Sequence, residues 1–294
     1  MNEKVITLVT IVIPCFNTPR EDLRRSVESV LTQDYDYIEV IIVDDCSDEP
    51  FSGLNSEPEY SGHELIHWIS QPVNRGVAAA RNAGVSQAKG AYVAFLDAGD
   101  WWDSKKITAQ VAAINDSKNI GLVYCGAQFH PLDGRVSWID MRELGVDAYR
   151  ELLIRQAISG SASAAMVRRD IIIDLGGFET EVEIPEDRDM WLRIARNYGV
   201  VLVSNVLTHI EVNPKSRSAE SQVKIASYKT FLRVYDAEIR NEGVMRDAYS
   251  HYHIVIAKKF YTERYRLRSL KHILLAGMIS PQFVVNGVIK LLKR

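Results

Sequence analysis

Residues 91–102 read Ala-Tyr-Val-Ala-Phe-Leu-Asp-Ala-Gly-Asp-Trp-Trp, an apolar run that ends abruptly in carboxylates. The run from Ala91 to Leu96 has no polar face, which is typical of a central strand in a parallel sheet covered on both sides. Ligands of open α/β sheets bind just beyond the carboxyl ends of such strands, where Asp97 and Asp100 would lie. Two interpretations stay open: the carboxylates hold a divalent cation with its phosphorylated substrate, or they begin a turn and cap the helix near Ser104.

Strands and helices alternate on both sides of this run. Further strands are expected at Val5–Ile13, Ile38–Val43, Leu65–Ile69, Gly121–Cys125 and Val200–Val203, and helices after Pro19 and over 76–88, 104–115 and 187–198. Because the connections are short, the alternation predicts an α/β fold with a mostly parallel sheet and helices on both faces. Residues 126–184 are less regular and are expected to form a β-hairpin and loops.

The C-terminal part differs in pattern and in charge. From about residue 218 it is expected to be helical, with two long helices and then a shorter pair broken at Pro281, so we divide the chain into residues 1–215 and 216–294. The whole chain of 294 residues carries a net charge of −3, which argues against nucleic-acid binding through a global basic field. Residues 258–294, however, contain nine Lys/Arg and one Glu, a net +8 that leaves −11 on the remainder. This basic end either contacts an anionic membrane surface or packs on the main domain with a solvated basic face.

Composition also bounds the location of the protein. No apolar run is long enough to span a bilayer without interruption, because a spanning helix needs about 20 apolar residues. The cysteines Cys15, Cys46 and Cys125 have no metal-ligand spacing, and no signal peptide precedes them. The pattern predicts reduced thiols and therefore a cytoplasmic protein. If the basic C-terminal end contacts a membrane, the contact would be peripheral and at the inner face of the cell membrane.

Three acidic clusters follow predicted strands or begin a helix: Asp44-Asp45, Asp97 with Asp100, and Glu186-Asp187-x-Asp189. Each has a purely structural explanation, because acids favour turns and the first turn of helices. Their coincidence at one sheet edge predicts a functional site. A dinucleotide fingerprint and a P-loop are both missing after the first strand.

Seven segments in a fixed order resemble family 2 glycosyltransferases of the GT-A fold over about residues 7–210. They are Val-Ile-Pro-Cys-Phe-Asn (12–17), Ser-Val-Leu-Thr-Gln (29–33), Ile-Ile-Val-Asp-Asp-Cys-Ser (41–47), Asn-Arg-Gly-Val-Ala-Ala-Ala-Arg-Asn-Ala-Gly (74–84), Ala-Lys-Gly-Ala-Tyr-Val-Ala-Phe-Leu-Asp (88–97), Gly-Gly-Phe (176–178) and Glu-Asp-Arg-Asp-Met-Trp-Leu-Arg (186–193). One such segment is a weak signal, whereas seven in register are specific.

The resemblance implies a GT-A, Rossmann-like catalytic domain and an inverting transfer in which Asp187 is the general base. Arg81 would offer its guanidinium to phosphate; an ion pair with a neighbouring acid is the alternative. Asp97 and Asp100 would hold a divalent cation, Mg²⁺ or Mn²⁺. The nucleotide-binding residues implied by the resemblance are Pro14, Phe16, Asn17, Asp45, Asn74, Arg81 and Asp97.

One position departs from the pattern of the family. The usual motif is Asp-x-Asp-Asp, but here Asp97-Ala98-Gly99-Asp100 puts a glycine where the second acid is expected. Three outcomes are open: Asp97 and Asp100 hold the cation alone or through water, the metal binds weakly, or catalysis proceeds without it. Mg²⁺ often takes only one or two carboxylates, so a reduced site is physically plausible.

We therefore predict a glycosyltransferase of the bacterial surface-glycan type. It would move a sugar from a nucleotide diphospho-sugar, with UDP favoured, to a hydroxyl of a glycan or lipid-linked acceptor. Lys215 and Arg217 would either close on phosphate or form a solvated linker. The alternative function is a non-catalytic nucleotide-sugar-binding or scaffold protein with a degenerate metal motif. The oligomeric state stays open.

Overall fold

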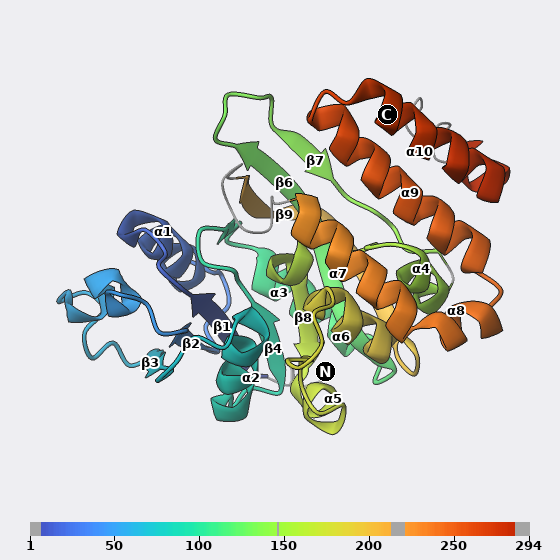
Figure 1. Ribbon diagram of the computed structural model, residues 1–294. Coiled ribbons are helices and arrows are strands. Elements are labelled where there is room, and N and C mark those ends of the chain that lie inside the picture. The colour runs from blue at the N-terminus through green and yellow to red at the C-terminus, as the bar shows by residue number, and fades with distance from the viewer. Residues whose placement is uncertain (1–6, 146, 213–220, 286–294) are drawn as a thin grey trace. The chain divides into compact units, whose positions relative to one another are not determined.

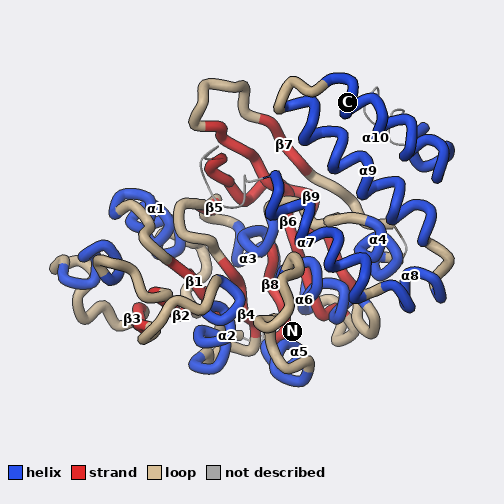
Figure 2. The backbone as a smooth tube through the Cα atoms, viewed as in Figure 1, coloured by secondary structure: helices blue, strands red, loops and turns tan. Residues whose placement is uncertain are grey.

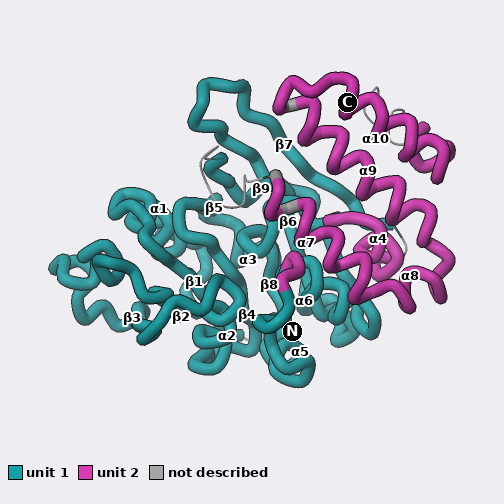
Figure 3. The backbone as a smooth tube through the Cα atoms, viewed as in Figure 1, with its two compact units in different colours: residues 1–146, 158–182, 186–213 teal, residues 147–157, 183–185, 214–294 magenta. Residues whose placement is uncertain are grey.

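The computed structural model describes residues 7–145, 147–212 and 221–285 (Figure 1). Contacts within the chain divide it into two compact units (Figure 3). Unit 1 contains residues 1–146, 158–182 and 186–213, and unit 2 contains residues 147–157, 183–185 and 214–294. The C-terminal segment of unit 2 begins at residue 214. Two short segments from the middle of the chain, residues 147–157 and 183–185, also belong to unit 2.

Unit 1 is built on one nine-stranded sheet of order β3-β2-β1-β4-β8-β6-β9-β5, with β7 paired to β6. Strands β3, β2, β1 and β4 run parallel, β8 is antiparallel to both of its neighbours, and β9 is parallel to β6. Figure 2 shows the strands in red. The strands are β1 (Val9–Cys15), β2 (Ile38–Asp44), β3 (Ile66–Ser70), β4 (Tyr92–Phe95), β5 (Trp101–Trp102), β6 (Ile120–Pro131), β7 (Trp138–Asp140), β8 (Ala165–Arg168) and β9 (Gly199–Val212). The expected α/β fold with a mixed, mostly parallel sheet is confirmed.

Helices cover both faces of this sheet because alternate residues of the central strands point to opposite sides. On one face, Val9, Ile11 and Ile13 of β1 join a buried cluster with α1 (Arg20–Leu31) and α3 (Lys106–Asn115). On the other face, α2 (Val77–Gln87) lies so close to β1 that a Cβ on Gly84 would sit 2.4 Å from Cγ1 of Val12. Gly84 is therefore required by the close approach of helix and strand.

The irregular middle of the chain contains more structure than expected. The β6–β7 hairpin confirms the predicted hairpin, but β8 lies in the centre of the sheet, between β4 and β6. β8 has only four residues, too few to show a period, which explains why the sequence did not predict it. The other elements in the regions expected to be loops are η1 (Pro50–Ser56), α4 (Ala148–Ile154), η2 (Ser161–Ala164) and α5 (Arg169–Asp174).

Unit 2 is helical. Between residues 221 and 280 the structure describes four helices, so the prediction of two long helices before a shorter pair is wrong in its count. The predicted break at Pro281 is present, because the fourth helix ends at Ile279 and the helix begins again at Pro281. Gly243, with φ +68°, turns the chain after the short second helix, where other residues would be strained. These helices are α7 (Ser221–Val234), α8 (Asp236–Asn241), α9 (Met245–Thr262) and α10 (Arg266–Ile279).

Candidate functional site

The site of unit 1 lies where the parallel strands end. β1 and β2 run in register so that Cys15 pairs with Asp44, and β4 continues into Leu96, whose backbone N–H donates to the carbonyl of Val12 at 3.0 Å. The carboxyl ends of these strands therefore meet at one edge, and Asp97 follows directly. The sixth helix, α6 (Glu186–Ala195), brings the third acidic cluster.

Asp45 organises the loop that leads into α2. Its carboxylate accepts hydrogen bonds from Nε2 of Gln71 at 2.8 Å and from the backbone N–H groups of Arg75 and Gly76 at 2.9 and 2.7 Å. Nδ2 of Asn74 donates to the backbone carbonyl of Asp45 at 3.1 Å. Since a carboxylate offers about four acceptor positions, these three contacts leave one for a ligand.

The end of β1 presents an aromatic ring beside this loop. Pro14 is buried within β1, whereas Phe16 directly after the strand is 50% exposed. Asn17 adopts a left-handed φ of +48° and exchanges two hydrogen bonds with Asp48, which ties the β1 and β2 loops together. An exposed ring held by two fixed loops is suited to stack against a planar ligand.

Arg81 connects two of the acidic clusters. Its side chain is only 1% exposed, its Nη2 lies 2.6 Å from Oδ1 of Asp97, and its Nη1 lies 2.8 Å from Oε1 of Glu186. Burial lowers the pKa of Arg81, but the two carboxylates outweigh burial and raise its pKa above the ordinary value. Of the two alternatives left by the sequence, the structure shows the ion pair, and it does so with two acids 89 positions apart on the chain.

Asp187, beside Glu186 in the first turn of α6, is buried and held by a strained loop. Oγ of Ser161 donates to its Oδ2 at 2.6 Å. Gly160 and Ser161 have φ values of +71° and +53°, and a left-handed conformation is uncommon for serine. The helix N-terminus also favours a negative charge at Asp187.

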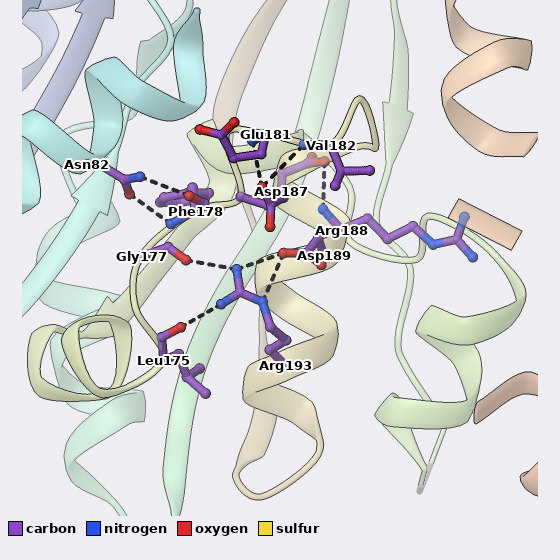
Figure 4. Close-up of polar contacts among 11 residues, drawn as sticks. Asn82, Leu175, Gly177, Phe178, Glu181, Val182, Asp187, Arg188, Asp189 and Arg193 are labelled. Atoms are coloured by element: carbon purple, nitrogen blue, oxygen red, sulfur yellow. Dashed lines mark hydrogen bonds and ion pairs between the residues drawn. The ribbon is translucent and has the colours of Figure 1, made fainter. Parts of the chain in front are cut away.

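A second network fixes the segment that precedes α6 (Figure 4). Asn82 and the backbone of Phe178 exchange two hydrogen bonds, at 2.9 and 2.7 Å. Arg193 pairs with Asp189 at 2.7 Å and donates to the carbonyls of Leu175 and Gly177. Asp189 thus holds the fold around the helix start.

The two predicted metal ligands differ in their surroundings. The side chain of Asp97 is 36% exposed. Asp100 is 9% exposed, and its carboxylate accepts from Oγ of Ser163 at 2.6 Å and from the backbone N–H of Glu211 at 3.2 Å. Burial and then the charge of Asp97 raise the pKa of Asp100 well above its ordinary value. No cluster of three or more His, Cys, Asp or Glu that could hold a metal ion occurs among the described residues.

Gly99 separates these two acids with a φ of +109°, and a Cβ there would meet nothing within 4 Å. The position has room for a side chain but a backbone conformation that L-residues rarely adopt. Of the two predicted ligands, Asp97 is the more exposed, and carboxylates at this motif fit Mg²⁺ or Mn²⁺ only if substrate phosphates and water complete the coordination. Lys215 and Arg217 lie outside the described residues.

The sequence did not single out Ser161 and Ser163, which contact Asp187 and Asp100. Both belong to Ser-Gly-Ser-Ala-Ser (159–163), a run of small residues just before β8. In the sequence, the glycine between Ser159 and Ser161 indicates a tight loop at this point. Which acid each hydroxyl would contact depends on pairings across the sheet and was not visible in the sequence.

The carboxylates lie beyond the strand ends of an open α/β sheet, where ligands of such sheets bind. Residues 10–176, more than half of the chain, match the family described as Glycosyl transferase family 2, so the chain belongs to this family. The family membership suggested by the seven sequence segments is confirmed.

Relatives of known or inferred activity are similar over different shares of their length. An uncharacterized glycosyltransferase of Haemophilus influenzae is 25% identical over 95% of this chain and 98% of its own length. The Escherichia coli protein WfaP, a UDP-Glc:alpha-D-GlcNAc-diphosphoundecaprenol beta-1,3-glucosyltransferase, is 37% identical over 38% of this chain and 43% of its own length. The WfaP similarity is thus confined to part of both proteins.

Two solved structures share the fold. The mannosyltransferase PcManGT from Pyrobaculum calidifontis, in complex with GDP-Man and Mn²⁺, superposes with a TM-score of 0.65 at 17% identity and covers 98% of this chain and 81% of its own. TarS residues 1–349 of S. aureus, in complex with UDP-GlcNAc, superpose with a TM-score of 0.62 at 14% identity, with 92% and 80% coverage. At these identities the likeness establishes the GT-A-like fold.

Proposed function

We propose that this chain transfers a sugar from a nucleotide diphospho-sugar to a hydroxyl of a glycan or lipid-linked acceptor, with inversion at the anomeric carbon. The observation that carries the proposal is the bridge made by Arg81. It joins Asp97, at the strand end where phosphates of α/β proteins bind, to Glu186, the neighbour of Asp187. The proposed donor end of the site and the neighbour of the proposed base are thereby joined through one buried guanidinium.

Asp187 is the general base in this proposal. Its Oδ2 accepts from Ser161, and the backbone N–H of Arg188 donates to its Oδ1 at 2.7 Å. Both contacts fix the orientation of the carboxylate that would accept a proton from the acceptor hydroxyl. A positioned base of this kind contributes about 10²–10⁴-fold to the rate.

The nucleotide would bind between the β1 end and the loop held by Asp45. The exposed ring of Phe16 offers a stacking surface, and the remaining acceptor position of Asp45 suits the N3–H of uracil. UDP is favoured on this ground and because WfaP uses a UDP-sugar. A GDP-sugar is the competing donor, since PcManGT binds GDP-Man.

Asp97 is the residue that would hold a divalent cation together with the donor phosphates. A cation bound there would neutralise the negative charge that develops on the leaving diphosphate. Arg81 holds the Asp97 side chain in place through its 2.6 Å contact, so the carboxylate is oriented before the donor arrives.

The acceptor is proposed as a sugar on a lipid diphosphate carrier or on a growing surface glycan. The support is the diphosphoundecaprenol acceptor of WfaP and the putative teichuronic acid biosynthesis role of the Bacillus subtilis protein TuaG, which is 38% identical over 35% of this chain. Both relatives match only part of this chain.

A second candidate is a non-catalytic nucleotide-sugar-binding protein, and Gly99 in place of an acid favours it. The experiment that separates the two is a donor panel: UDP- and GDP-sugars with Mg²⁺ or Mn²⁺, lipid-linked acceptors, and release of the nucleoside diphosphate as readout. Acceptor-dependent release supports the transferase. Binding of a donor by thermal shift without release from any donor–acceptor pair supports the second candidate.

A further inference from the structure

Helix α10 (Arg266–Ile279) carries an apolar stripe on its exposed side. Leu267, Leu270, Leu274 and Met278 follow the spacing i, i+3, i+7, i+11, which places them on one face of a helix. Their exposed fractions are 84%, 51%, 59% and 78%. Single exposed apolar residues are ordinary, whereas four on one continuous face indicate an interaction surface.

The other side of α10 is already packed within unit 2. Ser269 and Ala276 are buried; Oγ of Ser269 donates to the carbonyl of Ala257 at 2.8 Å, and Oγ of Ser250 on α9 donates to the carbonyl of Ala276 at 3.0 Å. These small residues seat α10 against α9. At 100° per residue they lie on the side of the helix roughly opposite the stripe, so this packing does not cover the stripe.

The charges around the stripe have one sign. α10 contains Arg266, Arg268 and Lys271, all exposed, and no acidic residue. The preceding turn adds Arg264 and a single acid, Glu263, which lies 3.8 Å from Lys259. Basic residues beside an exposed leucine-rich face are the pattern of a helix that lies in a lipid interface.

We propose that α10 docks in the plane of an anionic membrane surface. The stripe enters the boundary between headgroups and acyl chains, while Arg266 and Lys271 contact lipid phosphates. A spanning arrangement does not compete, because no helix of the described residues is long and apolar enough to cross a membrane. A second copy of the chain is disfavoured as occupant, since pairing two such faces would bring like charges together. The proposal stands on unit 2 alone and does not depend on the proposed activity.

The test is co-sedimentation of the full chain with vesicles of phosphatidylcholine alone or mixed with phosphatidylglycerol. We expect binding to the mixed vesicles that weakens as salt is raised. The triple variant Leu267→Ser, Leu274→Ser, Met278→Ser should bind about tenfold less or weaker still. The pair Arg266→Gln, Lys271→Gln should weaken binding and reduce its salt dependence. Val136→Ser, which changes an 88% exposed valine in the β6–β7 turn, is the matched control and should bind as the wild type does.

Two outcomes would overturn the proposal. One is unchanged vesicle binding of the triple variant. The other is an oligomer of the wild type, seen by light scattering, that the triple variant converts to a monomer while neither protein binds vesicles; this would make a second copy the occupant. If the triple variant fails to fold, the single variant Leu274→Trp provides a separate test. Brominated lipid should quench the fluorescence of the added tryptophan. The absence of quenching would contradict docking.

Discussion

Arg81 and Lys106, two of the buried cations of unit 1, differ in their surroundings. Arg81 lies between the carboxylates of Asp97 and Glu186, at 2.6 and 2.8 Å. Lys106 is fully buried; Nζ contacts Oε1 of Gln110 at 2.7 Å and lies 3.8 Å from the ring centroid of Trp102. The described part of the chain provides no carboxylate that pairs with Lys106. A buried charge at the strand ends is therefore matched by opposite charge, whereas the one in the core relies on an amide and an aromatic ring.

The protonation of the two cations reflects this difference. The carboxylates raise the pKa of Arg81, whereas burial lowers the pKa of Lys106 from 10.5 to about 8. Removal of Arg81 would leave two acids without their partner, which is costly, while removal of the Lys106 charge would relieve a desolvation penalty. The comparison teaches that burial alone does not reveal whether a charge stabilises the fold; its partners do.

The largest expected effect is that of Arg81→Met. It should lower the free energy of unfolding by about 3 kcal/mol, because Asp97 and Glu186 lose their counter-charge. Transfer should also be lost, since Asp97 is no longer oriented. Urea unfolding and nucleotide release measure the two effects. Arg81→Lys should have neither the stability nor the transfer rate of the wild type, because one ammonium cannot contact Asp97 and Glu186 as the two Nη atoms of arginine do. Wild-type stability and transfer in the lysine variant would contradict the described geometry.

Lys106→Met should have the opposite sign and depend on pH. The unfolded chain binds more protons than the folded chain between pH 8 and 10.5, so the stability of the wild type rises with pH across this window. At pH 6 the variant should be more stable by about 2 kcal/mol. This value is the desolvation penalty that is removed with the Lys106 charge, minus the cost of leaving Gln110 without its hydrogen-bond partner. This advantage should fall as pH rises from 8 to 10.5. A variant that is less stable at pH 6 would show that the Lys106 contacts outweigh its burial.

The next comparison separates the two acids of the motif. Asp97→Asn should reduce transfer about 100-fold, because the charge that would hold a cation is removed. It should change stability less than Asp100→Ala does, since the amide oxygen can still accept from the buried guanidinium of Arg81. Asp100→Ala should cost about 2 kcal/mol in stability by leaving Ser163 and the N–H of Glu211 unsatisfied. Thermal unfolding and turnover, measured on both variants, test the distinction. The reverse pattern would make Asp100 the residue at the reacting centre.

Ser161→Ala should give the smallest effect. Loss of one charge-assisted hydrogen bond to Asp187 should lower transfer about tenfold. Turnover, measured as release of the nucleoside diphosphate, checks this loss. Ser161→Asn, which keeps a hydrogen-bond donor and tolerates the left-handed backbone, is the control. Unchanged turnover in the alanine variant would show that the Ser161 hydroxyl does not support Asp187 in transfer.

The strands and the acidic clusters could be predicted because they are local in sequence. β1 and β2 are largely apolar, interrupted by Thr10 and Glu39, and Asp97 and Asp187 stand in recognisable segments. The contacts that give these acids different environments are not local: Arg81 meets Glu186 across 105 positions, and Ser163 meets Asp100 across 63. They depend on β8, a four-residue strand without period, and on a left-handed turn at Ser161, where a serine is not expected.

The most direct test of the account compares Asp187→Asn with Asp174→Asn, which makes the same chemical change at an exposed position at the end of α5. Donor binding is measured by thermal shift and transfer by release of the nucleoside diphosphate. We predict that Asp187→Asn binds the donor as the wild type does and transfers about 10²–10⁴-fold more slowly, with Asp174→Asn unchanged in both. Transfer by Asp187→Asn at nearly the rate of the wild type would contradict the assignment of Asp187 as the general base.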